Sequence, residues 1–152
     1  MSGELISTLA GKVPQRAIRY LDQLPYFVTY QSTAVIDFGN TGDDAFLTIT
    51  TPGTKRGKVM QVDLYAGAEE FAGTTDKAYI AIGTTDAGQE IAYTDDVADG
   101  ALTPVSYVDG SGLNAGAAPI IAAGDLVYVC GMDATGTPTG QAFAAVSLLY
   151  FE

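Results

Sequence analysis

The chain has 152 residues, which is enough for one domain with a substantial core and too few for two ordinary domains. Hydrophobic residues make up 47% of it and charged residues 16%, which excludes the composition of a disordered chain. The net charge of −11 argues against nucleic acid as a partner, and the absence of histidine excludes Ser–His–Asp and Cys–His catalysis and histidine-ligated metals.

The N-terminal segment differs in character from the remainder of the chain. Good helix formers come after Pro14, which suits a first helical turn, and Pro25 would end such a helix. We therefore predict an arm or short helix over residues 1–24, followed by a β-sandwich domain over residues 25–152. The segment has neither the basic start nor the long apolar stretch of a signal peptide, so we expect synthesis in the cytosol without export and no insertion into a membrane.

Charge also separates this segment from the rest. Within residues 1–20, Lys12, Arg16 and Arg19 outweigh the single acid Glu4, whereas residues 21–152 have seventeen acidic residues and four basic ones. A basic arm on an acidic body suggests that Lys12, Arg16 and Arg19 face a partner. The alternative is a terminal helix packed on its own domain.

From Tyr26 onward the hydrophobic period is that of β-strands, and clusters of Gly, Asp, Thr and Pro separate them at sandwich-like intervals. The turn signal over residues 133–140 predicts that the last two long strands form an antiparallel hairpin. The pattern as a whole predicts an all-β fold, an antiparallel, jelly-roll-like sandwich. The expected strands are 26–30, 34–38, 45–51, 58–66, 78–82, 90–93, 105–108, 120–121, 126–130 and 142–151.

Two features bear on how the core is held together. The chain ends in apolar strand residues, so we expect its C-terminus to lie within a sheet or an interface. Cys130 is the only cysteine, which excludes an intrachain disulfide, and its apolar neighbours predict a buried structural side chain.

Two motifs suggest ligands. Asp37, Gly39 and Thr41 match the Asp-x-Gly-x-Thr phosphate loop of actin-like and sugar-kinase ATPases, but the chain has no second loop and no α/β domains, which favours a hairpin turn. The three carboxylates in residues 94–100 could hold a hard cation, yet their spacing is not that of an EF-hand, which favours a solvated loop. The sequence leaves open whether the loop of Asp95, Asp96 and Asp99 binds a cation, and no cofactor is expected.

Nine tyrosines are spread over the chain, mostly within predicted strands. Tyrosine is amphipathic, so such residues could form a sugar-binding face or an oligomer interface, or could belong to the core and sheet edges. The sequence alone does not separate these possibilities.

Residues 120–150 resemble the closing hairpin of small β-sandwich proteins on the particles of tailed phages. Residues 58–66, and residues 78–86 with their Gly-Thr-Thr-Asp turn, resemble the middle strands of those proteins. The Ala-Gly-Asp before an apolar strand is also similar to tumour-necrosis-factor-like jelly rolls. The resemblance implies a capsid decoration (cement) or head-fibre protein, often trimeric, with no catalytic residues.

We therefore expect a non-enzymatic structural protein of a virion that binds the major capsid protein or another virion protein, forms a homotrimer, and contacts neither nucleic acid nor membrane. The main alternative is a carbohydrate-binding β-sandwich for adsorption to a host surface, using tyrosines and acidic loops. A two-carboxylate glycosidase is a third possibility, disfavoured because the chain has no tryptophan to line a sugar site.

Overall fold

The computed structural model describes residues 24–39, 45–72, 76–132 and 139–152. These residues form strands and no helix, so the predicted all-β class is confirmed. The predicted arm lies outside the described residues except for Leu24. The strands are β1 (Tyr26–Gln31), β2 (Ile36–Asp37), β3 (Ala45–Thr50), β4 (Arg56–Ala66), β5 (Tyr79–Gly83), β6 (Ala92–Thr94), β7 (Val105–Asp109), β8 (Gly112–Ala115), β9 (Ile120–Ile121), β10 (Leu126–Met132) and β11 (Gln141–Phe151).

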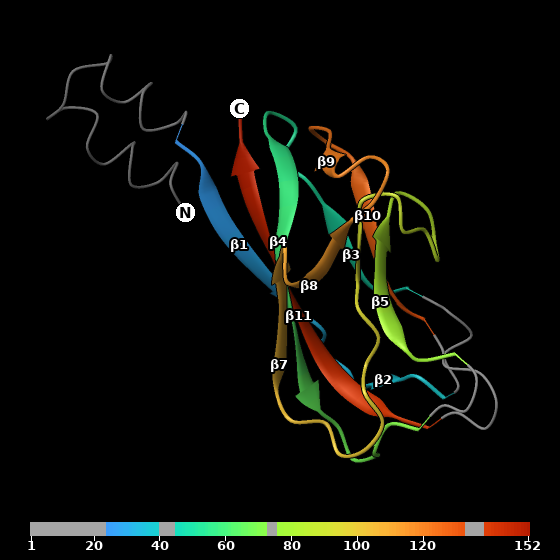
Figure 1. Cartoon of the computed structure of the whole chain (residues 1–152). Coiled ribbons are helices and arrows are strands. Elements are labelled where there is room, and N and C mark those ends of the chain that lie inside the picture. The colour runs from blue at the N-terminus through green and yellow to red at the C-terminus, as the bar shows by residue number, and fades with distance from the viewer. Residues whose placement is uncertain (1–23, 40–44, 73–75, 133–138) are drawn as a thin grey trace, which may run out of the picture.

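The strands form one mixed sheet in the order β1-β11-β4-β7-β8-β6-β5-β10-β3, with β2 beside β11 and β9 beside β4. The sheet curls into a nearly closed, barrel-like arrangement. In Figure 1, β1, β11, β4 and β7 lie toward one side, and β5 and β10 lie toward the other. We call these the β11 side and the β10 side.

One pairing is parallel, which corrects the expectation of a purely antiparallel sheet. Val108 of β7 pairs with Gly112 of β8 in parallel, although only two residues separate the strands. The chain turns sharply here through Gly110 and Gly112, whose φ angles of 80° and 78° suit glycine. This corner carries the sheet from the β11 side to the β10 side.

The core lies between the two sides and follows from strand alternation. On β11 every second residue, from Ala142 to Tyr150, is buried. On β4 the register shifts opposite Ser147 and Leu148, and this bulge at Met60 keeps Val59 and Val62 on the inner face. The β10 side contributes further fully buried residues: Ile80, Ile82, Val127 and Val129.

The prediction that the last two long strands form a hairpin is wrong. β10 pairs with β3 and β5, whereas β11 pairs with β1, β4 and β2, so the two strands do not pair with each other. The physical reason is that each is a central strand whose two edges are already occupied. A turn signal in sequence shows that the chain reverses or bends, but not which strand lies beside which.

Strand boundaries differ in smaller ways. The strand predicted over 34–38 is reduced to Ile36–Asp37, and the strand predicted over 90–93 lies at Ala92–Thr94. β8 was not predicted because its Gly- and Asn-containing sequence has the composition of a turn. It is held in a strand by pairing with β6.

Both expectations about the core are confirmed. The C-terminal strand is paired on both edges, and Leu148 and Tyr150 are buried within it. The Cys130 side chain is fully buried. Its Sγ atom accepts a hydrogen bond from the Ala87 amide and donates one to Asp86 Oδ1, at 3.2 and 3.3 Å. The loop after β5 therefore folds over the outer surface of β10.

Candidate functional site

An open hollow on the described surface lies at β5 and β6. It has a volume of about 470 Å³ and is open to solvent. A hollow of this size falls within the range that small-molecule sites occupy. Two tyrosines, an amide, a hydroxyl and two carboxylates line it: Tyr79, Gln89, Tyr93, Thr94, Asp95 and Asp96.

Strand alternation places the two tyrosines together. Ile80 and Ile82 of β5 face the core, so Tyr79 faces outward. Tyr93 of β6 pairs with Ala81, which lies two residues after Tyr79 on β5. The Tyr93 ring is therefore a diagonal neighbour of the Tyr79 ring on the same outer face. Both tyrosines are half-buried and line the hollow, and Ala81 is fully buried beside them.

Thr94 fixes the backbone at the edge of this hollow. Its side chain is buried, and its Oγ1 atom accepts a hydrogen bond from the Ile80 amide at 3.0 Å. Just beyond the end of β6, the Asp95 amide donates to the Gly112 carbonyl at 2.6 Å. The chain at Thr94 and Asp95, which leads into the two carboxylates, is therefore hydrogen-bonded to both β5 and β8.

The two carboxylates make the hollow electronegative. Asp95 Oδ1 accepts a hydrogen bond from the Asn114 side chain at 2.8 Å. Burial, followed by the charges of Asp95 and Asp96, raises the pKa of the Tyr107 phenol above its usual value. Such a site disfavours anionic ligands.

The loop that supplies Gln89 is held by its neighbour Glu90. Glu90 Oε1 accepts hydrogen bonds from the Thr84 amide and hydroxyl, at 2.5 and 2.6 Å. The hydrogen bond from the Thr84 side chain is the main reason that the pKa of Glu90 lies below its usual value, and it outweighs the opposing effect of burial. Gly83 and Gly88 leave space for the Glu90 side chain, because a Cβ on either would approach its carboxylate within 2.6 Å.

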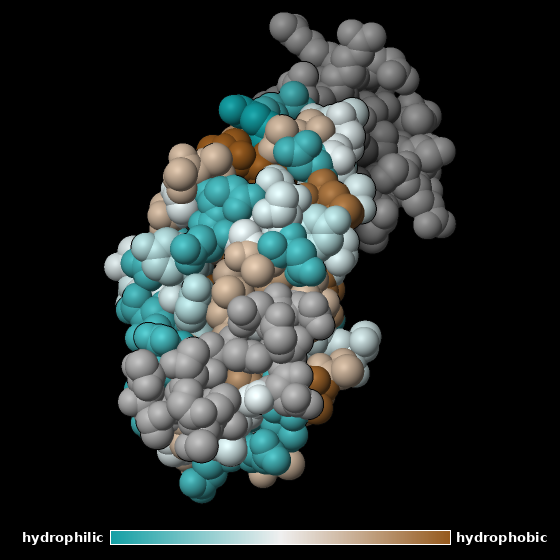
Figure 2. Space-filling model, turned by 90° about the vertical axis from the view of Figure 1, so that its right-hand side faces the viewer, coloured by the Kyte–Doolittle hydropathy of each residue, from teal (hydrophilic) through white to brown (hydrophobic). Residues whose placement is uncertain are grey.

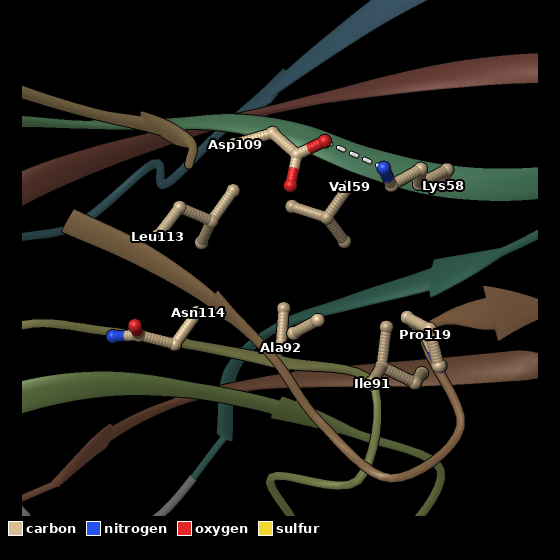
Figure 3. A pocket seen from close by; sticks show the side chains of 9 residues that line it. Lys58, Val59, Ile91, Ala92, Asp109, Leu113, Asn114 and Pro119 are labelled. Atoms are coloured by element: carbon tan, nitrogen blue, oxygen red, sulfur yellow. Dashed lines mark hydrogen bonds and ion pairs between the residues drawn. The ribbon is translucent and has the colours of Figure 1, made fainter. Parts of the chain in front are cut away.

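A second gap lies where β4 faces β6 and β8 (Figure 3). Val59, Ile91 and Leu113 point into it, and an ion pair between Lys58 and Asp109, 2.5 Å long, closes one end. Its volume is only about 10 Å³, roughly the room that one water molecule needs. It is therefore a packing defect rather than a ligand site.

The outer face of β1, β11 and β4 is the other notable surface, and we call it the β11 face. Phe27 is 64% exposed and stands opposite Leu149 of β11. Phe143 and Tyr65, exposed by 41% and 45%, pair across β11 and β4. At the other end of β11, the Arg56 guanidinium lies 5.0 Å from the centre of the Phe151 ring. On the solvent side of β11, aromatic side chains therefore lie near both ends of the strand. The middle is polar, with Ser147 hydrogen-bonded to Thr29 and Gln61 to Asp63.

The view in Figure 2, from the β5 side of Figure 1, shows a more mixed surface. Hydrophilic and intermediate residues cover most of its described part, and the strongly hydrophobic patches are small and separate. Scattered exposed apolar residues of this kind are ordinary on a protein surface.

The residues predicted to bind a partner, Lys12, Arg16 and Arg19, all lie outside the described residues, so their role stays a prediction. In the Asp-x-Gly-x-Thr motif, Asp37 Oδ1 accepts a hydrogen bond from the Gly39 amide at 3.0 Å, as in a turn that closes on itself. Thr41 lies outside the described residues.

The acidic loop divides between two environments. Asp95 and Asp96 line the hollow, whereas Asp99 forms an ion pair with Lys77. Within the described ranges, no three carboxylate or thiol side chains are grouped so that they could hold a metal ion. The hollow itself was not predicted, because Gln89 belongs to a loop and the two tyrosines are fourteen positions apart in the chain. The alternation of each strand was the only signal that could have placed them on one face.

No family model, curated protein or solved structure matches this chain. Nor does any helix in the described part of the chain have the length and apolar character needed to cross a bilayer.

Proposed function

We propose that this chain is a non-catalytic structural protein of a virus particle, a decoration or head-fibre subunit that binds and stabilises the capsid surface through the β11 face. The β11 face is the observation that carries the proposal. Its partner is the major capsid protein or another virion protein. The protein is made in the host cytoplasm and ends in the virion.

The energetics of the β11 face support protein contact. Burying a large apolar side chain contributes about 1.5–3 kcal/mol, and Phe27, Tyr65 and Phe143 each keep a large part of their surface in water. Among the described strands, β1 pairs only with β11, so no other described strand occupies its outer edge. A sheet edge flanked by aromatic side chains is a surface to which a neighbouring virion protein can add.

The finer architecture forms part of the same proposal. The β11 side and the β10 side correspond to the two layers of a jelly-roll-like sandwich, with the β7–β8 corner joining them. A sandwich leaves one outer face of each layer for contacts. In a homotrimer on the capsid, the β11 face of each subunit is then the layer that contacts the capsid, and Lys12, Arg16 and Arg19 add charge contacts with the neighbouring virion protein.

The first test is whether the chain is present on particles. We expect mass spectrometry of purified particles from the phage that encodes it to detect the chain, and immunogold labelling to place it on the head. Its absence from such particles would show that the proposal is wrong.

The second test locates the contact. Particles from a deletion strain are incubated with purified wild-type, Phe27→Ser, Phe143→Ser or Leu126→Ser protein. Leu126 on β10 has the same 41% exposure as Phe143 but lies on the other side of the barrel, which makes it a matched control. We expect both phenylalanine variants to bind at least about tenfold more weakly and the control to bind normally. Equal binding by all four proteins would exclude the β11 face as the contact.

A further inference from the structure

We propose that the hollow at β5 and β6 is a carbohydrate-binding site for a hydroxyl-rich saccharide without anionic groups. The site is independent of attachment to a particle, because it lies on the β10 side, whereas the contact surface proposed above lies on β1, β11 and β4.

The two tyrosines supply the apolar part of such a site. Tyr79 and Tyr93 come from paired strands, face the same side of the sheet and are only half-buried. The C–H face of a sugar ring is apolar and packs on an aromatic ring, which itself loses little conformational entropy on binding. Because β5 and β6 are hydrogen-bonded to each other, the spacing of the two rings is set before a ligand arrives.

The carboxylates and the amide supply the polar part. Asp95 and Asp96 offer acceptors for sugar hydroxyls, and Gln89 offers both a donor and an acceptor. The Asn114 amide bonds to Asp95 Oδ1 and helps to fix the orientation of that carboxylate. The volume of about 470 Å³ suits an oligosaccharide segment rather than a single small ion.

The negative charge of the hollow distinguishes neutral from acidic saccharides. The hollow contains two carboxylates and no basic side chain in its lining, within a protein of net charge −11. A uronate or sialate carboxylate would be repelled, whereas a neutral sugar would only exchange hydrogen bonds with water for hydrogen bonds with the protein.

The test uses the full chain on an array of neutral, amino and acidic oligosaccharides. The strongest neutral ligand is then titrated into the protein and followed by NMR. We expect at least one neutral oligosaccharide to bind with a dissociation constant of about 1 mM or tighter and to shift the ring signals of Tyr79 and Tyr93. No response to any neutral or amino sugar at about 10 mM, or binding by acidic sugars alone, would overturn the proposal.

Variants locate the site. Tyr93→Ala and Asp96→Asn are expected to weaken binding by about tenfold each, whereas Tyr65→Ala, which removes an exposed tyrosine from the β11 face, leaves it unchanged. A Tyr79→Phe variant keeps the ring and loses only the hydroxyl, so it tests the site even if a Tyr79→Ala variant does not fold. We expect Tyr79→Phe to retain most of the affinity. If Tyr65→Ala weakened binding as much as Tyr93→Ala, the hollow would not be the site.

Discussion

At the scale of single residues, the carboxylate of Glu90 stabilises the loop beside the candidate sugar site. It holds the amide and the hydroxyl of Thr84 and so closes the loop of residues 84–90. Gln89, which lines the hollow, stands next to it in the chain. The charge of Glu90 therefore helps to hold this loop, together with the hydrogen bonds of Asp86 and Ala87 with Cys130.

Because the pKa of Glu90 is lower in the folded protein than its usual 4.5, the Glu90 carboxylate stabilises the folded state above pH 4.5. This stabilisation is lost as the pH falls below that value.

We expect Glu90→Gln to lower the free energy of unfolding by about 1 kcal/mol at pH 7 and to speed hydrogen exchange at the Thr84 amide. Glu69→Gln, at an exposed glutamate after β4, is the control. Unchanged exchange at Thr84 would contradict this role.

Tyr150 gives a second pH dependence, on the alkaline side. Its hydroxyl lies 2.8 Å from that of Tyr30, and the Tyr26 ring packs against it with ring centres 5.5 Å apart. Burial, followed by the hydrogen bond to Tyr30, raises the pKa of Tyr150 well above its usual 10.0. The folded state therefore retains this proton, and stability that is complete below pH 10 is lost as the pH rises above it.

We expect Tyr150→Phe to lower stability by about 1 kcal/mol at pH 7, since one buried hydrogen bond is lost, and to reduce the loss of stability above pH 10. Tyr107, whose pKa is also raised, accounts for part of the alkaline loss that remains. Chemical denaturation at pH 7 and pH 11 measures both effects. An alkaline loss identical to that of the wild type would contradict the assignment.

At the scale of elements, β11 is the strand that joins most of the fold. It pairs with β1, β2 and β4, and its inner face contributes Ala142, Ala144, Val146, Leu148 and Tyr150 to the core. The end of β11 also lies beside the start of β1, since Tyr150 pairs with Tyr26. Loss of its last residues would therefore expose the core and release β1 together.

We expect truncation after Ser147 to abolish the cooperative unfolding transition measured by circular dichroism. Removal of Glu152 alone is the control. It deletes the partner of the buried Lys55, 3.2 Å away, but leaves β11 intact, so we expect lower stability with the cooperative transition retained. A cooperative transition in the longer truncation would show that β11 is not essential to the core.

At the scale of the whole molecule, the β11 face and the acidic body have opposite effects on association with other proteins. The strongly negative net charge opposes self-association, whereas an apolar face favours it. Three of the four basic residues in the described ranges, Lys55, Arg56 and Lys58, lie at the start of β4, beside the β11 face. Lys55 pairs with Glu152 and Lys58 with Asp109, so these residues reduce the negative charge beside the β11 face but do not make it basic.

We expect light scattering after size exclusion to give a mass three times the 15.8 kDa of one chain. Phe27→Ser and Leu126→Ser should both leave this mass unchanged, because the β11 face contacts the capsid. Closed cyclic symmetry is the usual form of such assemblies, and a trimer suits three-fold positions on a capsid lattice. A clean monomer at all concentrations would contradict the trimer and favour a single-site binding module.

The sequence by itself determined the all-β class, most of the strands, the burial of Cys130 and the inclusion of the C-terminus in the sheet. These features depend on local signals, because period-two alternation and turn residues act within a few positions of the chain.

Only the tertiary structure decided which strands are neighbours. It separated β10 from β11, bent the chain at the β7–β8 corner, and brought Tyr79 and Tyr93 together beside Asp95 and Asp96. Local alternation shows which face of a strand is apolar but not which strand lies beside it. Pairing depends on how all the apolar faces are buried at once, and the hollow exists only because that packing places β5 against β6.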